Sequence, residues 1–442
     1  MKRDAVLLRG AVVSSTLLYV AVFNWTYFKV IAPTYGYWGL TANPTPWPYI
    51  LISWAACIVP SLWMRIKILR PSQIFFLIQY YVIFIPACFV LYNSSKPFIP
   101  PENALVVILL MFFGLSILQA VYYVPLSVCF HFRTTSLSFW AAVIAIVAAL
   151  IGYTVYSFGA NFRIANLEEI YSVRAALAEA VEASGTRFGF YAQMWLAGFF
   201  FPFFAAVGLE TKRRWLLLLA AGGYLLLFGI GGSKTTLFAL IYFPAVFLWL
   251  AYSSRYKIPI FVLGLCFFLS FGVLMDLVGF TGFTYWYVAV VNFRTFSAPG
   301  FLIGQYLDFF SNNPLTYMSH VTGFNILIPS PYDMDIPRML GMHYYASPVG
   351  LNAGFWAGDG IAGFGPPGII IMSAVCALVF WIFDSVAKRF EPRFVIIAAT
   401  FIATSFGNIS LSTTVVSGGL GLLLAAIFSM PNKGTLRTAF RI

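Results

Sequence analysis

An aspartate lies at the centre of the stretch of this sequence best suited to chemistry. Asp359 belongs to the run Asn352-Ala-Gly-Phe-Trp-Ala-Gly-Asp-Gly-Ile-Ala-Gly-Phe-Gly365, directly before an apolar run. The glycines let backbone and ligand approach closely, and a carboxylate among aromatic side chains can bind a sugar hydroxyl or act as a general base. An aspartate that only caps a helix also fits this position. His320 and His343 lie in the same part of the chain without the spacing of metal ligands.

A short turn with a lysine is a candidate anion site. In Gly231-Gly-Ser-Lys-Thr-Thr236, Ser233 is a natural N-cap, which places Lys234 and both threonines in the first turn of a helix. Free N–H groups, hydroxyls and a lysine together favour an anion. The turn lacks the spacing of a nucleotide-binding P-loop. The alternative is a tight turn whose lysine extends to the membrane surface.

Two arginines are further candidates for binding an anion. Arg174 lies in a stretch rich in helix formers, and Arg294 follows the aromatic run Tyr285-Trp286-Tyr287. A planar guanidinium can hold a phosphate by two parallel hydrogen bonds. Either arginine can instead be an anchor at the membrane surface.

The elements that position these residues are predicted to be membrane-spanning helices. Of the 442 residues, 61% are hydrophobic and only 9% are charged, far from the composition of a soluble domain. Apolar runs of spanning length recur along the whole chain. The fold class is therefore all-α and polytopic, with residues 1–442 forming one integral-membrane domain. About twelve spans are expected, at 7–28, 47–64, 73–93, 104–126, 137–158, 190–208, 215–231, 235–252, 258–279, 367–386, 394–410 and 414–430.

The basic residues predict the orientation of these spans. Eighteen of the 26 Lys and Arg residues fall in the termini and the connections that share their side, and the positive-inside rule makes that side cytoplasmic. Lys234, Arg174, Arg294 and Arg338 are among the eight on the opposite side. Because the basic residues sit in short clusters between apolar runs, the net charge of +12 indicates membrane orientation and not a nucleic-acid partner.

Two long segments are expected on the outer side. The segment 159–189 holds an amphipathic helix near 166–183. The segment 280–366 reads as helical over 284–310, with an interruption at Pro299-Gly300, and as an ordered loop over 325–350. The five cysteines lie in or beside apolar runs, which predicts buried free thiols.

Four motifs in this order resemble those of the bacterial O-antigen or oligosaccharide repeat-unit polymerases. They are Tyr171-Ser-Val-Arg174, Gly232-Ser-Lys234, Arg294-Thr-Phe-Ser-Ala-Pro299-Gly with Tyr306-Leu-Asp-Phe-Phe310, and the run around Asp359. The resemblance covers roughly residues 160–430. The family more often has arginine where Lys234 stands, and it usually lacks the glycine before Asp359.

The resemblance implies an integral-membrane glycosyltransferase of the GT-C-like type in the bacterial inner membrane. Such an enzyme moves a growing glycan from undecaprenyl pyrophosphate onto a new lipid-linked repeat unit on the periplasmic side and needs no nucleotide sugar. No cofactor and no metal are expected, since the sequence shows no group of residues with metal-ligand spacing. This role also suggests a polysaccharide chain-length regulator as a partner. The expected catalytic base is Asp359, with His343 as second choice.

The remaining expected site residues divide into two groups. Arg174, Lys234, Arg294 and Ser233 are expected to bind the pyrophosphate, whose developing charge they would stabilise. Arg338, Tyr171 and Trp356 are expected to contact the sugars.

Two alternatives remain open from the sequence. An O-antigen ligase would use the same donor and transfer the glycan to lipid A–core, and ligase-like sequences are expected to use an outer histidine such as His320 or His343. A transporter of lipid-linked sugars is expected to show inverted repeats or charges deep in several spans, and neither is visible here.

The cations give a test of the shared pyrophosphate site. Arg174→Lys and Arg294→Lys are expected to shorten or abolish the polymer, because a point charge does not replace a planar fork. Lys234→Arg should be tolerated better than Lys234→Ala. Polymer length on a gel, with membrane protein level as control, is the measurement. Wild-type ladders from both Arg→Lys variants would contradict the shared site.

Overall fold

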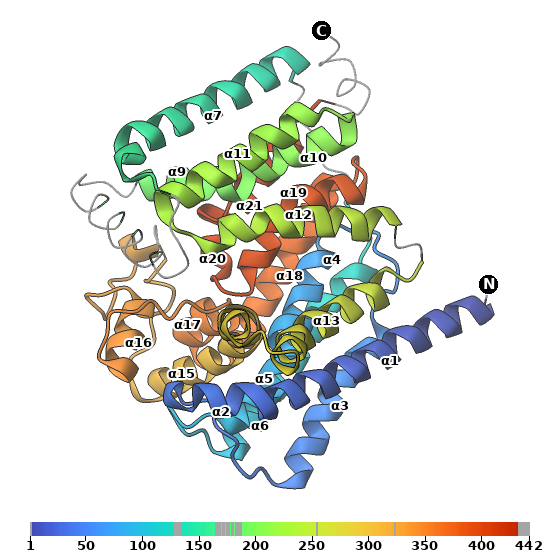
Figure 1. Cartoon of the computed structure of the whole chain (residues 1–442), viewed down its shortest axis with the longest axis vertical. Coiled ribbons are helices and arrows are strands. Elements are labelled where there is room, and N and C mark those ends of the chain that lie inside the picture. The colour runs from blue at the N-terminus through green and yellow to red at the C-terminus, as the bar shows by residue number, and fades with distance from the viewer. Residues whose placement is uncertain are drawn as a thin grey trace.

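The computed structural model describes residues 2–127, 134–163, 188–252, 255–321 and 324–431, together with single positions within 164–187. Tyr171 and Arg174 lie outside the described residues, as does most of the helix expected near 166–183. Within the described part, the chain is all helical apart from short connections (Figure 1).

The first third of the chain forms a group of packed helices. Its elements, with π-helical and 3₁₀ segments labelled η, are α1 (Lys2–Thr26), η1 (Tyr27–Ile31), α2 (Ala32–Tyr35), η2 (Gly36–Trp38), α3 (Trp47–Trp63), α4 (Gln73–Ile78), η3 (Gln79–Phe84), α5 (Ile85–Val90), η4 (Leu91–Asn93), α6 (Pro101–Ala120) and η5 (Val121–Tyr123). Helix α1 also packs along α13, and α6 along α18.

The second part supplies the helices of the other flank and also α13, which packs against α1 of the first group. They are α7 (Ser136–Phe158), η6 (Gly159–Asn161), α9 (Phe188–Trp195), η7 (Leu196–Phe200), α10 (Phe201–Thr211), α11 (Arg214–Gly231), α12 (Lys234–Tyr252) and α13 (Lys257–Leu277). Helix α10 contacts both α11 and α19, while α12 contacts α11 and α13 and so links the two flanks (Figure 1).

The last part completes the bundle. It contains α14 (Thr281–Tyr287), η8 (Val288–Ser297), α15 (Ala298–Asn312), η9 (Phe324–Ile326), α16 (Ile336–Tyr345), η10 (Trp356–Ile361), α17 (Ala362–Phe364), α18 (Gly368–Ala387), α19 (Pro392–Phe406), α20 (Leu411–Val416) and α21 (Leu420–Ser429).

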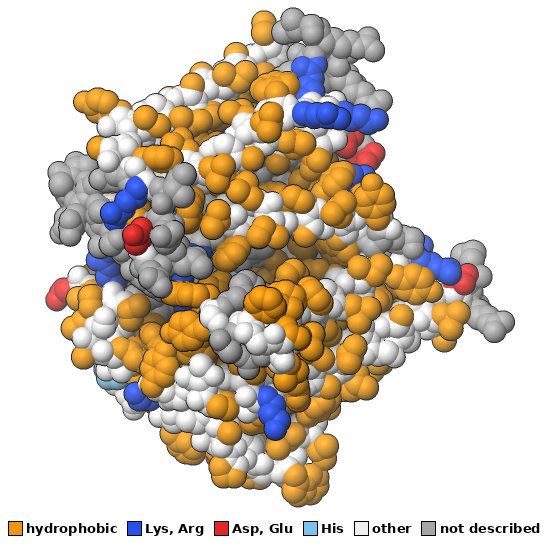
Figure 2. Space-filling view, in the orientation of Figure 1, with side chains coloured by type: hydrophobic (Ala, Val, Ile, Leu, Met, Phe, Trp, Pro, Cys, Tyr) orange, Lys and Arg blue, Asp and Glu red, His pale blue; other side chains and the backbone are white. Residues whose placement is uncertain are grey.

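Helix length and hydropathy make this a multi-pass membrane protein. Ten helical stretches among the described residues are long and apolar enough to cross a membrane. The two other expected spans, 47–64 and 394–410, correspond to the shorter apolar helices α3 and α19, of 17 and 15 residues. Hydrophobic side chains cover most of the face seen in Figure 2, and Lys and Arg gather at a few places.

Prolines widen the helices without ending them. Four of the five π-helical segments in the described residues are followed directly by an α-helix with proline at its second position, namely Pro33, Pro86, Pro202 and Pro299. Proline has no N–H, and its ring crowds the carbonyl four residues back. A wider π turn relieves that crowding and keeps the backbone hydrogen-bonded, as an apolar environment requires.

Two expectations for 280–366 are corrected by this geometry. The Pro299-Gly300 pair does not break the helix, because η8 passes into α15 with helical backbone at Ser297. The expected loop 325–350 contains the ten-residue helix α16, in which Pro337 stands in the first turn. Proline is favoured there, since an N–H in the first turn has no acceptor within the helix.

Cations cap the helices that end at one side of the bundle. Arg9 donates to the last carbonyls of α3, Lys257 to Leu250 of α12, and Arg389 to Ile427 of α21. The guanidinium of Arg70 donates to Val121 and Val124, just beyond α6. These carbonyls have no partner within their own helices, and the negative end of the helix dipole favours a cation.

Helix α15 lies inside the bundle. Every residue from Ala298 to Leu307 is buried, and α15 contacts α5, η8 and η10. A Cβ added at Gly300 would lie 2.7 Å from the Cα of Ala87 and 3.1 Å from its backbone nitrogen. Glycine therefore sets the distance between α15 and α5.

This contact predicts opposite effects for two Gly→Ala substitutions. Gly300→Ala should lower the melting temperature in detergent, because overpacking against backbone atoms costs about 1–3 kcal/mol. Gly264→Ala on α13 is the matched control. Its Cβ meets nothing within 4 Å, and alanine is favoured over glycine in a helix by about 1 kcal/mol. A Gly300→Ala protein that melts at or above the wild-type temperature would contradict the packing.

Candidate functional site

Asp359 lies in the π-helical segment η10, whose glycines allow close backbone contacts. The carbonyl oxygen of Gly360 would be 2.0 Å from a Cβ at Gly368, the first residue of α18, and a Cβ at Gly358 would lie 3.1 Å from the Cβ of Ser410. Side chains at these glycines would push η10 away from α18 and from the connection before α20. The glycines thus bring the Asp359 carboxylate to the start of α20.

The Asp359 carboxylate is fully buried and hydrogen-bonded. Ser412 donates its backbone N–H to Oδ2 at 2.8 Å and its hydroxyl to Oδ1 at 2.8 Å. Nε2 of His320 lies 3.3 Å from Oδ1. The carboxylate therefore caps the first turn of α20 and holds the edge of an imidazole at the same time.

His320 is the part of this group that reaches solvent. Its side chain is 17% exposed, whereas that of Asp359 is 0% exposed. On the other edge of the ring, Nδ1 lies 2.7 Å from the hydroxyl of Thr316, which is also 2.9 Å from the carbonyl of Ala362. The backbone N–H of Thr316 donates to the same carbonyl, which ties the His320 turn to α17.

The hydroxyl of Thr316 suits two proton arrangements. It has one proton, which it can donate either to Nδ1 of His320 or to the carbonyl of Ala362. In the first arrangement His320 is neutral, with its proton on Nε2 facing the carboxylate. In the second, Nδ1 carries a proton and donates to the Thr316 oxygen. The site can therefore accept a proton on His320 by rotation of one hydroxyl.

His343, Arg338 and Trp356 lie in different surroundings. His343 and Arg338 are exposed on α16, and the His343 ring packs edge-on against Phe309 and Tyr344. Trp356 is buried and donates its indole N–H to Ser373 of α18 at 3.1 Å. The histidine that contacts Asp359 is thus His320 and not His343, and Trp356 holds η10 against α18.

Of the residues expected to bind the anion, the described ones, Ser233, Lys234 and Arg294, lie on other elements. Helix α12 begins at Lys234, as the Ser233 N-cap predicted, and the carbonyl of Ser233 accepts the N–H of Thr236. Nζ of Lys234 lies 5.5 Å from the centre of the Trp286 ring on α14. Arg294 is exposed eight residues further along, on η8, about 12 Å at the rise of a helix. No contact within the described residues joins these cations to Asp359.

Thr316 and Ser412 are functional candidates that sequence reasoning missed. The i, i+4 spacing of Thr316 and His320 was a weak signal, because the chain there is a turn and not a helix. Ser412 lies in Ser410-Leu-Ser412-Thr-Thr, which reads only as a helix start.

Among the described residues, no group of three or more His, Cys, Asp or Glu side chains could hold a metal ion. The four described cysteines are buried and free, as expected.

Comparisons with protein-family models, with curated proteins and with solved structures find no match to this chain.

The hydrogen bonds of Asp359 predict a difference between two substitutions. Asp359→Ala leaves the N–H and hydroxyl of Ser412 without an acceptor and should cost about 1–3 kcal/mol of stability. Asp359→Asn should melt near the wild-type temperature, since its carbonyl can accept the N–H and its amide can donate to the hydroxyl of Ser412. Melting in detergent is the measurement. Equal melting temperatures for both variants would contradict the capping role.

Proposed function

We propose that this protein is a glycosyltransferase that joins undecaprenyl-pyrophosphate-linked oligosaccharide repeat units into O-antigen or a related surface polysaccharide. One observation carries the proposal. In the stretch that resembles repeat-unit polymerases, the buried carboxylate of Asp359 holds the partly exposed imidazole of His320. A carboxylate–imidazole pair is an arrangement that general-base chemistry uses.

In this proposal His320 is the base and Asp359 orients it. Asp359 accepts a hydrogen bond from the N–H of Nε2, so that Nδ1 carries the lone pair. The hydroxyl of Thr316 first turns from Nδ1 to the carbonyl of Ala362, 2.9 Å away, and leaves this lone pair open. The acceptor sugar hydroxyl then gives its proton to Nδ1 as its oxygen bonds to the anomeric carbon of the donor glycan. This assignment moves the role of base from Asp359 to His320.

The leaving group in this reaction is undecaprenyl pyrophosphate. As the bond from the anomeric carbon to the pyrophosphate oxygen breaks, negative charge develops on the pyrophosphate, and positioned cations stabilise it. Lys234 at the first turn of α12 and Arg294 on η8 are the proposed cations, with Arg174 proposed from the sequence alone. Arg338, which is exposed on α16, is proposed to contact the sugars, and Tyr171 is proposed for the same role from the sequence alone. Trp356 supports η10 from within the bundle.

The proposed setting is the periplasmic side of a bacterial inner membrane. Arg9, Arg70, Lys257 and Arg389 cap helices at one side of the bundle, and the positive-inside rule favours the cytoplasm for such a side. A polysaccharide chain-length regulator is a proposed partner.

An O-antigen ligase is the second candidate function. The pairing of His320 with Asp359 favours it as well, because a ligase is expected to use an outer histidine. The two functions share donor and base, and they differ in the acceptor.

Deletion of the gene, followed by lipopolysaccharide gels, separates these functions. A polymerase mutant should show core capped by one repeat unit. A ligase mutant should show bare core, with lipid-linked polymer accumulating. A mutant with no periplasmic repeat unit would contradict both functions and indicate a transporter.

Two histidine substitutions test the site itself. His320→Ala should lower turnover about 10²–10⁴-fold, the usual loss of a general base, whereas His343→Ala should stay near wild type. Asp359→Asn should also lose activity at normal protein level, because its amide would face Nε2 and favour the wrong tautomer. Polymer yield, normalised to membrane protein, is the measurement. Near-normal polymer from His320→Ala would remove His320 as the base.

A further inference from the structure

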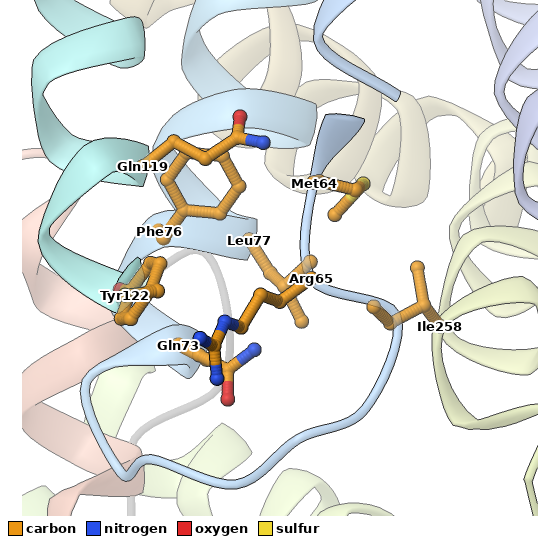
Figure 3. A pocket seen from close by; sticks show the side chains of 8 residues that line it. All are labelled: Met64, Arg65, Gln73, Phe76, Leu77, Gln119, Tyr122 and Ile258. Atoms are coloured by element: carbon orange, nitrogen blue, oxygen red, sulfur yellow. The ribbon is translucent and has the colours of Figure 1, made fainter. Parts of the chain in front are cut away.

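A small cavity lies where α3 ends and α4 begins, apart from the Asp359 site. Figure 3 shows the eight side chains that line it. They are Met64, Arg65, Gln73, Phe76, Leu77, Gln119, Tyr122 and Ile258. The cavity volume that the centre of a water molecule can occupy is about 10 Å³. The cavity therefore has room for one atom of the size of a water molecule.

The amide of Gln119 has a donor in this cavity that meets no acceptor among the described residues. Gln119 is 2% exposed, and its Nε2 is buried without a hydrogen-bond partner in the described part of the chain. The orientation of the amide is fixed, because the indole of Trp63 can only donate and its Nε1 lies 2.7 Å from Oε1 of Gln119. A buried N–H₂ without an acceptor costs about 1–3 kcal/mol, so the cavity favours an occupant with an acceptor oxygen.

A positive charge lies at the same cavity. The guanidinium of Arg65 is 4.9 Å from the centre of the Tyr123 ring, and within the described residues no carboxylate forms an ion pair with it. Burial lowers the pKa of the nearby Arg70 guanidinium, Asp384 raises it, and Arg65 lowers it by less than Asp384 raises it. Arg70 thus already has a carboxylate acting on it, whereas Arg65, which lines the cavity, supplies its positive charge.

The surroundings place this cavity at the level of lipid headgroups. Trp63 and Tyr123 are exposed, and the Tyr123 hydroxyl donates to the carbonyl of Trp63. Exposed Trp and Tyr side chains beside a basic connection are typical of a membrane–water interface. The connection here carries Arg65, Lys67 and Arg70.

We propose that this cavity binds the phosphate of an anionic lipid headgroup. One phosphoryl oxygen, similar in size to water, enters the cavity and accepts from Nε2 of Gln119. The other oxygens remain at the mouth with Arg65, and the acyl chains follow the apolar surface of the bundle. The proposal is independent of the glycosyltransferase activity.

Binding of phosphatidylglycerol to the purified full-length protein tests the proposal. Native mass spectrometry and melting in detergent, each with phosphatidylglycerol or phosphatidylcholine added, are the measurements. Wild-type protein should retain phosphatidylglycerol preferentially and melt higher with it. Arg65→Gln and Gln119→Glu should each weaken that binding about tenfold or more, the loss of one charge-assisted hydrogen bond. Gln119→Glu keeps an acceptor for Trp63, so its fold should be preserved.

Lys67→Gln is the matched control. Lys67 belongs to the same connection, but its side chain does not line the cavity, so this variant should retain the lipid preference. Equal effects of the two lipids on wild-type protein would overturn the proposal, as would a preference that survives in both cavity variants. The same stabilisation by inorganic phosphate without lipid would overturn the assignment to a headgroup.

Discussion

The structure depends on one constraint, that backbone N–H and C=O groups in an apolar environment must find partners within the protein. Helices satisfy this along the spans, and the difficult places are prolines and helix ends. A π-helical segment directly precedes each of four α-helices that have proline at their second position, so the helix continues without a break. At the ends of α3, α12 and α21, and just beyond α6, a cation supplies the missing donor.

The same constraint shapes the candidate site. Helix α20 begins inside the protein, and its first turn needs acceptors for its N–H groups. Asp359 supplies one for Ser412, and Ser410 supplies another for Thr413. Because the carboxylate is already fixed by Ser412, it can hold the imidazole of His320 in one orientation without solvent. A structural cap thus becomes a positioning group, which is why Asp359 serves both stability and the proposed catalysis.

The basic residues also serve more than one purpose. From the sequence they predict an orientation of the chain in the membrane. In the structure Arg9, Arg70, Lys257 and Arg389 are fixed on helix ends, whereas Arg65 contacts an aromatic ring beside a cavity with an unsatisfied amide. Arg65 and Arg70 belong to the same connection but have different partners. Arg70 donates to helix-end carbonyls and acts as a cap, whereas Arg65 lies against an aromatic ring and is proposed to bind a lipid phosphate.

The sequence alone was enough to predict the all-α multi-pass class, because long apolar runs have few other solutions. It also predicted the start of α12 at Lys234 and the burial of the four described cysteines, which depend on local chemistry. It placed a break at Pro299-Gly300 and missed α16, since the response to a proline depends on the turn that precedes it and on neighbouring helices. The partner of Asp359 was decided only by tertiary structure. His320 and Ser412 are 39 and 53 residues away along the chain, and the glycine contacts of η10 with α18 and with the connection before α20 bring them together.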